Sequence, residues 1–405
     1  MKKNIIAGQS GGPTAVINAS LYGIIKEGIS HGEIGRIYGM LNGIEGFLSG
    51  SYIDLTDELT EEELELLKLT PAAYLGSCRY KLPEDLSSPV YPLLFEKLRN
   101  LEIGYFFYIG GNDSMDTVSK LSRYGAQCQS DIRFIGIPKT IDNDLIFTDH
   151  TPGYGSAAKY VASTVREIGL DSSIYQPKSV TIVELMGRHA GWLTAASALA
   201  RKFDGDNPLL IYLPETDFDF EHFALDLENA FTKASSVLVC ISEGISDAQG
   251  KFICEYADTV RLDTFGHKML TGSGKVLENY VRSRFGVKVR SIELNVTQRC
   301  SGMIASAADV GESVRAGAEG VKAALEGVSG KMIAFRRTGN SPYTLEYTAV
   351  SVGDVCNQEK PFPAEWICKN GTDVTEDFLE YALPLIQGEL NRKMESGRPV
   401  YLYRK

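Results

Sequence analysis

The feature that most constrains the fold is a repeated alternation of short apolar runs with helical patterns. Residues 4–7, 105–109, 134–137, 180–185 and 237–241 are mostly apolar, which is typical of strands buried on both faces of a sheet. Most of these runs lead into a glycine-containing loop and then into a stretch with helical periodicity. This alternation predicts a doubly wound α/β fold in which helices cover parallel sheets.

The length and the charge of the chain limit its architecture and its partners. A chain of 405 residues is too long for one ordinary hydrophobic core, so we expect about two domains. The formal net charge of −11 argues against a nucleic-acid partner and against an anionic membrane surface. An acidic protein that handles anions must concentrate its positive charge locally, which directs attention to lysine and arginine in glycine-rich loops.

No segment predicts export or membrane insertion. The first apolar run, Ile5 to Ala7, is too short for a signal-peptide core, and no stretch approaches the roughly 18 apolar residues of a membrane span. The seven cysteines show neither CxxC spacing nor regular pairing, which favours reduced thiols and argues against a zinc site. We therefore expect a cytoplasmic protein without a membrane partner.

Two glycine-containing loops follow strand-like runs. In residues 8–14, Gly11 and Gly12 could turn backbone N–H groups towards a phosphate, or they could serve a structural turn. In residues 110–114, Asn112 and Asp113 follow two glycines, and Ser114 could be the N-cap of a helix. A negative Asp113 is unfavourable beside phosphate unless a cation lies nearby, but it could exclude a longer polyphosphate.

A third loop, residues 138–144, contains a lysine and two carboxylates after a buried run. If the segment is extended, Asp142 and Asp144 lie on the same side. One carboxylate could then act as a general base towards a hydroxyl, and the other could help to hold Mg²⁺, while Lys139 supplies positive charge. The alternative is a surface turn, because proline, asparagine and aspartate are common turn formers.

A fourth loop, residues 186–191, places Arg188 directly after a buried run. An arginine there is suited to clamp a phosphate or a sugar phosphate. The alternative is a solvated arginine at a helix start, where the helix dipole disfavours a cation. His189 is interpreted as structural.

Taken together and in this order, these loops resemble the phosphofructokinase family from residue 3 to at least residue 305. In ATP-using members the positions of Asp113 and Lys139 are generally glycine, whereas members that use inorganic pyrophosphate resemble this chain. Asp113 would repel the α-phosphate of a nucleotide, and Lys139 would occupy its place. The matching segments are GGPTAVINAS, GSCR (76–79), GGNDS, PKTIDND, MGR, SEG (242–244) and TQR (297–299).

The resemblance implies a role for each matching residue. Asp142 would take the proton from the 1-hydroxyl of fructose 6-phosphate, with Lys139 and Arg188 as further catalytic residues. Pyrophosphate would be held by Gly11, Gly12, Arg79, Asp113 and Lys139, and Mg²⁺ by members of the set Asn112, Asp113 and Asp144. The sugar phosphate would be held by Thr140, Ile141, Asp142, Met186, Gly187, Arg188, Glu243, Arg290 and Arg299.

The chain departs from the family pattern at three positions. Asn112 stands where the family usually has a metal-site aspartate, Val296 where a histidine is often found, and Ser179 where many ATP enzymes have an arginine from a neighbouring subunit. The segment after about residue 310 carries no site motif. It is interpreted as a structural addition and a candidate interface.

The resulting hypothesis is a Mg²⁺-dependent enzyme that forms fructose 1,6-bisphosphate reversibly from fructose 6-phosphate and pyrophosphate in glycolysis and gluconeogenesis. We expect two Rossmann-like α/β/α domains with the site in the cleft between them, and a homodimer or homotetramer. The donor domain would contain residues 1–150 and about 300–340, and the fructose 6-phosphate domain residues 151–299 and about 341–405. The alternatives are an ATP-dependent 6-phosphofructokinase, a catalytically silent sugar-phosphate sensor and a dehydrogenase, although the last lacks the fingerprint glycines.

Overall fold

The structure, a computed structural model, describes residues 2–174, 176–257 and 272–404. The chain forms two compact units. The first unit comprises Met1–Ser156, Arg299–Glu359 and Gln387–Lys405, and the second unit comprises Ala157–Gln298 and Lys360–Ile386.

The division of the chain after residue 340 differs from the expected one. The sequence assigned residues 341–405 to the second domain, but residues 341–359 and 387–405 lie in the first unit. The reason is that β10 (Lys331–Asn340) pairs with β5 (Arg133–Pro138) and forms a hairpin with β11 (Tyr343–Ser351). The chain after residue 340 therefore continues the sheet of the first unit.

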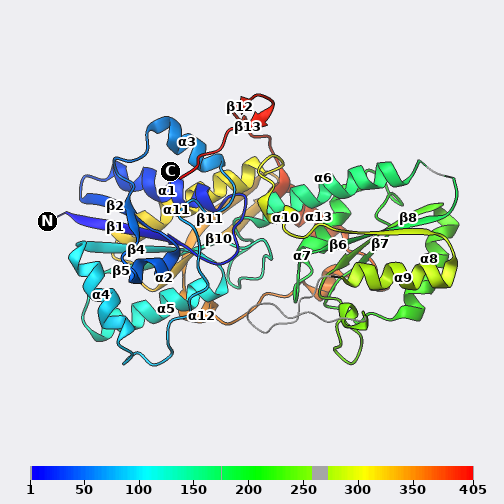
Figure 1. Ribbon diagram of the computed structural model, residues 1–405, viewed down its shortest axis with the longest axis horizontal. Helices are drawn as coiled ribbons and strands as arrows, with labels where there is room; N and C mark the ends of the chain where they lie inside the picture. Colours follow the sequence, from blue (N-terminus) through cyan, green and yellow to red (C-terminus); the bar gives the residue numbers. More distant parts are fainter. Residues whose placement is uncertain (1, 175, 258–271, 405) are drawn as a thin grey trace. The chain divides into compact units, whose positions relative to one another are not determined.

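The first unit is built on a seven-stranded sheet with the order β11-β10-β5-β4-β1-β2-β3 (Figure 1). The strands from β10 to β2 run parallel, whereas β11 and β3 pair antiparallel with their neighbours at the two edges. The other strands of this sheet are β1 (Lys3–Gln9), β2 (Ile34–Met40), β3 (Tyr52–Asp54) and β4 (Ile103–Gly110).

Alternate side chains of the central strands are buried on opposite faces of this sheet. Phe106 and Tyr108 of β4 pack on one face, and Phe107 and Ile109 pack on the other. Helices α2, α4, α5 and α12 cover the first face, and α1, α3 and α11 cover the second (Figure 1). Their bounds are α1 (Ile17–Ser30), α2 (Gly43–Leu48), α3 (Glu61–Leu69), α4 (Val90–Asn100), α5 (Asn112–Gln127), α11 (Ala307–Leu325) and α12 (Val352–Val355).

The second unit contains a four-stranded parallel sheet with the order β7-β8-β6-β9. One core cluster joins its strands to α8 and α9 through residues such as Phe223 and Leu277. Its strands are β6 (Ser179–Leu185), β7 (Leu210–Tyr212), β8 (Ser236–Ser242) and β9 (Lys288–Glu293). Its helices include α7 (Trp192–Ala195), η1 (Ala196–Ala200), α8 (Phe220–Lys233), η2 (Ile253–Tyr256), α9 (Ser273–Phe285), η3 (Ala364–Trp366), α13 (Glu376–Ala382) and η4 (Leu383–Ile386).

The remaining elements are α6 (Tyr154–Ser172) and α10 (Thr297–Cys300), which span the boundaries between the units, and the short hairpin of β12 (Met394–Glu395) and β13 (Arg398–Pro399). The expected α/β class is confirmed, since both sheets are mainly or wholly parallel. Among the residues that the structure describes, no helix has both the length and the apolar character needed to span a bilayer.

Candidate active site

Three of the loops singled out in the sequence meet at one edge of the first sheet. Strands β1, β4 and β5 are parallel neighbours, so the loops that follow them leave from the same edge. Backbone hydrogen bonds join these loops directly, because Ser10 N donates to Ile109 O at 3.0 Å and Lys139 N donates to Gly110 O at 3.0 Å. This is the edge at which open α/β sheets bind ligands.

The glycine pair of the first loop allows a close approach by other groups. Gly11 has a φ of +76°, and its N–H donates to Cys78 O at 3.2 Å, so this amide is not directed at an anion. Ser77 Oγ donates to Gly11 O at 2.6 Å, and these two bonds hold the segment that carries Arg79 against the loop. Gly11 therefore contributes its conformation, not a phosphate-binding N–H.

Two cations approach this glycine pair. Lys139 is only 3% exposed, and its Nζ donates to Gly12 O at 2.6 Å. A Cβ on Gly12 would lie 2.8 Å from Arg299 Nη1, so the guanidinium fits only beside glycine. Arg299 Nε is buried and has no hydrogen-bond partner among the described residues. A buried N–H without a partner calls for an explanation, and a bound anion would supply one.

The charge balance around Lys139 also favours an anion. The pKa of Lys139 is lowered to about 8, mainly by burial and also by the charges of the nearby Arg299 and Arg79. The carboxylates of Asp142 and Asp144 act in the opposite direction but do not restore the ordinary value. A phosphate group at this position would stabilise the charged ammonium and raise its pKa.

The loop that carries the two carboxylates is bent. Asn143 has a φ of +56°, and its Oδ1 accepts a hydrogen bond from Thr151 N at 3.1 Å. Asp142 N donates to Thr140 Oγ1 at 3.1 Å, which closes a local turn. The segment is therefore not extended, so the expectation that Asp142 and Asp144 lie on the same side does not apply. Asp142 and Asp144 are both half-buried and flank the left-handed residue.

Asp113 has a cation beside it that no sequence motif indicated. Lys81 Nζ lies 3.2 Å from Asp113 Oδ1, and both side chains are 75% exposed. Its position two residues after Arg79 was the available signal. Lys81 offsets the negative charge that made Asp113 an unexpected residue for a phosphate-binding loop.

Asn112 does not fit the role of a metal ligand. Its Nδ2 donates to Gln358 O at 2.5 Å, and its Oδ1 accepts from Asn357 N at 2.7 Å. Of the expected metal set, Asp113 and Asp144 keep carboxylates suited to a cation. The described residues contain no group of three or more His, Cys, Asp or Glu side chains that could hold a metal ion. A metal would therefore need further ligands from a bound substrate or from water.

The second unit brings the other loop residues together. Gly187 has a φ of +136°, and its N–H donates to Glu243 Oε1 at 3.3 Å. A Cβ on Gly244 would lie 1.9 Å from Arg188 O, so the segments that contain Arg188 and Glu243 pack without side-chain space between them. Burial raises the pKa of Glu243, whereas its bond from Gly187 N–H and the charge of Arg188 lower it. Met186, Gly187, Arg188 and Glu243 thus form one cluster at the carboxyl end of β6.

Arg290 lies apart from this cluster. It pairs in register with Thr181, four residues before the end of β6 at Leu185, which corresponds to roughly 13 Å along a strand. Its guanidinium lies 3.8 Å from Asp171 Oδ2, and it lines a hollow of about 270 Å³ with Asp171 and Ile292. The second unit by itself does not bring Arg290 to the Met186–Glu243 cluster.

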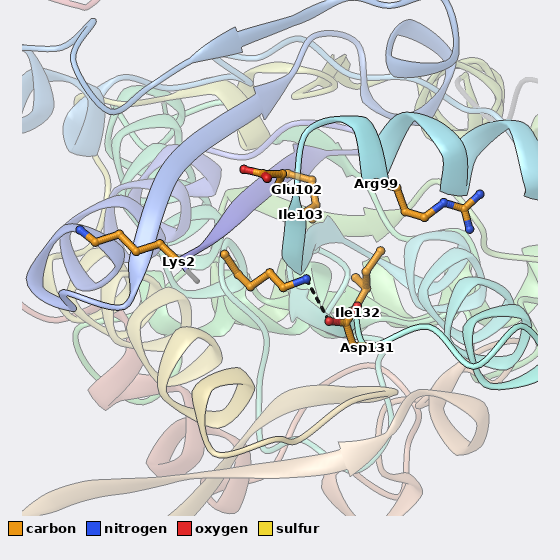
Figure 2. A pocket seen from close by; sticks show the side chains of 7 residues that line it. Lys2, Arg99, Glu102, Ile103, Asp131 and Ile132 are labelled. Atoms are coloured by element: carbon orange, nitrogen blue, oxygen red, sulfur yellow. Dashed lines mark ion pairs between the residues drawn. The ribbon is translucent and has the colours of Figure 1, made fainter.

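A separate hollow of about 130 Å³ lies at the amino ends of β1, β4 and β5. Lys3 Nζ forms an ion pair with Asp131 Oδ2 at 2.9 Å, which Figure 2 draws as a dashed line to the labelled Asp131. Because this is the opposite edge of the sheet, the hollow is not part of the site described above. It is lined by Lys2, Lys3, Arg99, Glu102, Ile103, Asp131 and Ile132.

Comparisons with known proteins agree with the geometry. Residues 4–323 match the family model for phosphofructokinase. The pyrophosphate–fructose 6-phosphate 1-phosphotransferase of Halomonas elongata is 39% identical over 400 residues, which are 98% of this chain and 94% of the relative. The protein of the same name from Rhodospirillum rubrum is 40% identical over 95% of this chain and 94% of its own length. The crystal structure of a pyrophosphate-dependent phosphofructokinase from Nitrosospira multiformis is similar with a TM-score of 0.90 and 35% identity, over 99% of this chain and 96% of that one.

Proposed function

The chain belongs to the phosphofructokinase family, and we propose that it transfers a phosphoryl group reversibly from inorganic pyrophosphate to the 1-hydroxyl of fructose 6-phosphate. The products are fructose 1,6-bisphosphate and phosphate. One observation carries the proposal, namely the buried ammonium of Lys139, which lies against Gly12 and within the electrostatic reach of Asp142. Glycine at position 139 would leave this space open for a nucleotide, whereas the lysine side chain fills it.

The donor would be held by cations around the glycine pair. Lys139 and Arg299 approach Gly12, and Arg79 contributes to the same positive field. These charges suit the two phosphates of pyrophosphate. A nucleotide would bring a third phosphate and a nucleoside into the space that Lys139 fills, which would weaken ATP binding, and the exposed Asp113, paired with Lys81, would add a repulsion of at most about 1 kcal/mol.

The transfer itself is proposed to proceed in line. Asp142 takes the proton of the 1-hydroxyl, the hydroxyl oxygen forms a bond to the terminal phosphorus, and the bridging P–O bond breaks to release phosphate. Lys139 and Arg188 offset the negative charge of the transferred group. The proposed contacts of the sugar phosphate are Thr140, Ile141, Met186, Gly187, Glu243 and Arg299. Arg290 is left out because, within the second unit, it lies apart from the Met186–Glu243 cluster.

Members of this family generally require a divalent metal ion, and we propose Mg²⁺ for this chain. Asp113 and Asp144 are the residues that would hold it, together with water and pyrophosphate oxygens. This arrangement suits Mg²⁺, which is usually bound through one or two carboxylates plus substrate phosphates and keeps several waters. When bound, the ion would neutralise negative charge on the phosphate oxygens.

The relatives also support wider proposals. We propose that the protein is cytoplasmic, that it acts in glycolysis and gluconeogenesis, and that it assembles as a homodimer or homotetramer. These extensions follow from membership of the phosphofructokinase family, since the names of the relatives state the activity alone.

A donor comparison tests the main proposal. Purified protein is assayed for fructose 1,6-bisphosphate formation with pyrophosphate or with ATP, and we expect kcat/KM to be at least about 100-fold higher with pyrophosphate, because two unfavourable contacts oppose ATP. Activity with ATP and none with pyrophosphate would assign the chain to the ATP-dependent alternative. Inactivity with both donors, with fructose 6-phosphate still bound, would favour the silent sensor.

A double substitution tests the physical reason. Asp113→Gly combined with Lys139→Gly should shift the donor preference towards ATP. The matched control is Lys3→Gly combined with Asp131→Gly, an ion pair at the opposite edge of the same sheet (Figure 2), which should leave donor choice unchanged. Persistent exclusion of ATP in the double variant would mean that other side chains close the nucleotide space.

A further inference from the structure

The carboxamide of Asn112 fixes two consecutive backbone groups far along the chain. It donates to Gln358 O at 2.5 Å and accepts from Asn357 N at 2.7 Å. This pair of bonds requires both a donor and an acceptor on one planar group, which an amide supplies. A carboxylate could accept from Asn357 N, but it would repel the carbonyl oxygen of Gln358. The contact therefore gives a physical reason for asparagine at the position where the family usually has aspartate.

The bonded residues lie immediately before the chain leaves the first unit. Asn357 follows α12 and has a φ of +62°, so the chain turns sharply there. The first unit ends at Glu359, and Lys360 begins the next part of the second unit. Asn112, the first residue of α5, thus anchors this turn to the start of the helix, where Asp113 is the next residue.

The far end of the same segment is anchored to the loop that carries Arg188. Trp192 Nε1 donates to Lys360 O at 3.2 Å, and Phe362 N donates to Glu215 Oε1 at 2.9 Å. The same carboxylate oxygen accepts from Gly191 N at 2.8 Å. The rings of Trp192 and Phe362 also pack edge to face with their centroids 5.1 Å apart.

We propose that Asn112 is a positioning residue and that residues 357–362 form a strap that couples pyrophosphate binding to fructose 6-phosphate binding. One end of the strap is fixed by Asn112 beside Asp113, and the other is fixed by Trp192 and Glu215 at the end of the Arg188 loop. A change in either loop is thereby transmitted along a short covalent segment. The inference rests on the proposed function, because that function assigns the two ligands to the two loops.

The coupling can be measured without turnover. Imidodiphosphate, in which nitrogen replaces the bridging oxygen, serves as a pyrophosphate analogue, and fructose 6-phosphate binding is titrated calorimetrically in Mg²⁺ with and without it. The ratio of the two dissociation constants is the coupling, and it must be the same whichever ligand is added first. We expect imidodiphosphate to tighten fructose 6-phosphate binding in the unmodified protein.

Asn112→Asp and Asn112→Ala separate a strap anchor from a metal ligand. A metal ligand would be improved by aspartate and removed by alanine. A strap anchor is lost in both variants, so we expect the coupling ratio to fall about tenfold in both, as for the loss of one or two hydrogen bonds. The Mg²⁺ concentration for half-maximal activity should change less than about twofold in both variants. The inference would be overturned if the Mg²⁺ concentration for half-maximal activity fell in the aspartate variant and rose in the alanine variant. It would also be overturned if the coupling ratio were unchanged in both variants.

A variant at the other anchor provides an independent measurement. Trp192→Phe keeps an aromatic ring against Phe362 but deletes the bond to Lys360 O, and it should lower the coupling in the same direction. If both anchors act through one strap, Asn112→Ala combined with Trp192→Phe should reduce coupling no more than the larger single effect. Additive losses would contradict a shared strap. The control is Gln358→Ala, which removes an exposed side chain bonded to Asp354 O and leaves the main-chain contact with Asn112 intact.

The outcomes also separate this inference from the proposed function. A protein that does not use pyrophosphate refutes the function itself. A protein that uses pyrophosphate but whose coupling is insensitive to Asn112 and Trp192 refutes only the strap.

Discussion

Replacing Lys139 by methionine should make the ligand-free protein more stable and the enzyme almost inactive. Lys139 is only 3% exposed, and burial is the main reason that its pKa falls from 10.5 to about 8. Methionine is unbranched and of similar length, so it fills the same space without a charge. The substitution therefore removes a buried cation while it keeps most of the packing.

The magnitude follows from the shift in pKa. A pKa that falls from 10.5 to about 8 corresponds to a penalty of roughly 3 kcal/mol for the charged form in the folded protein. The lost hydrogen bond to Gly12 O removes about 1 kcal/mol of stabilisation. The net expectation at pH 7 is a gain of roughly 2 kcal/mol in the free energy of unfolding.

The stability gained by Lys139→Met should decrease as the pH rises. Because the pKa is lower in the folded protein than in the unfolded chain, the penalty is fully present below pH 8 and disappears as the pH rises from about 8 to 10.5. The advantage of methionine should therefore shrink by roughly 2 kcal/mol between pH 7 and pH 9.5. Urea unfolding of the ligand-free unmodified protein and of ligand-free Lys139→Met at these two pH values measures this difference in the free energy of unfolding. The control, Lys322→Met, changes an exposed lysine on α11 and should show no such trend.

The activity of the same variant completes the test. We expect kcat/KM for pyrophosphate to fall by at least about 100-fold, because the charge that stabilises the transferred group is gone. A methionine variant that is less stable at pH 7, or whose stability difference does not change with pH, would refute the buried-cation reasoning. Unchanged use of pyrophosphate would refute the assigned role of Lys139.

Two further predictions concern other residues of the first unit. Asp142→Asn should lower kcat by about 100- to 10,000-fold, as expected for loss of a general base, while calorimetry shows fructose 6-phosphate bound within about threefold of the unmodified affinity; unchanged turnover would remove Asp142 from that role. His150 lies 2.8 Å from both Asp149 and Glu312, and although burial lowers its pKa, these carboxylates raise it to about 9. The ion pairs of His150 should therefore stabilise the protein fully below pH 6.5, and this stabilisation should be lost as the pH rises through 9. In urea unfolding, the free energy of unfolding of His150→Gln should differ from that of the unmodified protein most at pH 6 and least above pH 9.

Local patterns in the sequence were sufficient to predict the strands and the loops that follow them. The runs around Ile5, Phe107 and Ile135 are strands, and the local spacing of Thr60 and Glu63 forms a capping box at the start of α3. These features depend on residues close together in sequence. The stretch of helical periodicity after the fourth loop divides into α7 and the 3₁₀ segment η1.

The features that the sequence did not reveal depend on contacts between distant segments. Nothing local in Gly12 indicates that Arg299 will lie against it, and nothing in Asn112 indicates bonds to Asn357 and Gln358. The left-handed turn at Asn143 likewise depends on a bond to Thr151. Residue types predicted the chemistry of these loops, but only the folded chain shows which partners each side chain has already engaged.

The meeting of Gly12 with Arg299 has a consequence for biosynthesis. During translation, the nascent polypeptide will have emerged for most of its length before this guanidinium becomes available, and strand β10 of the same sheet follows later still. An amino-terminal fragment that ends near Ser156 would contain Gly11, Gly12, Arg79 and Lys139 but would lack Arg299 and the two strands β10 and β11 of the same sheet.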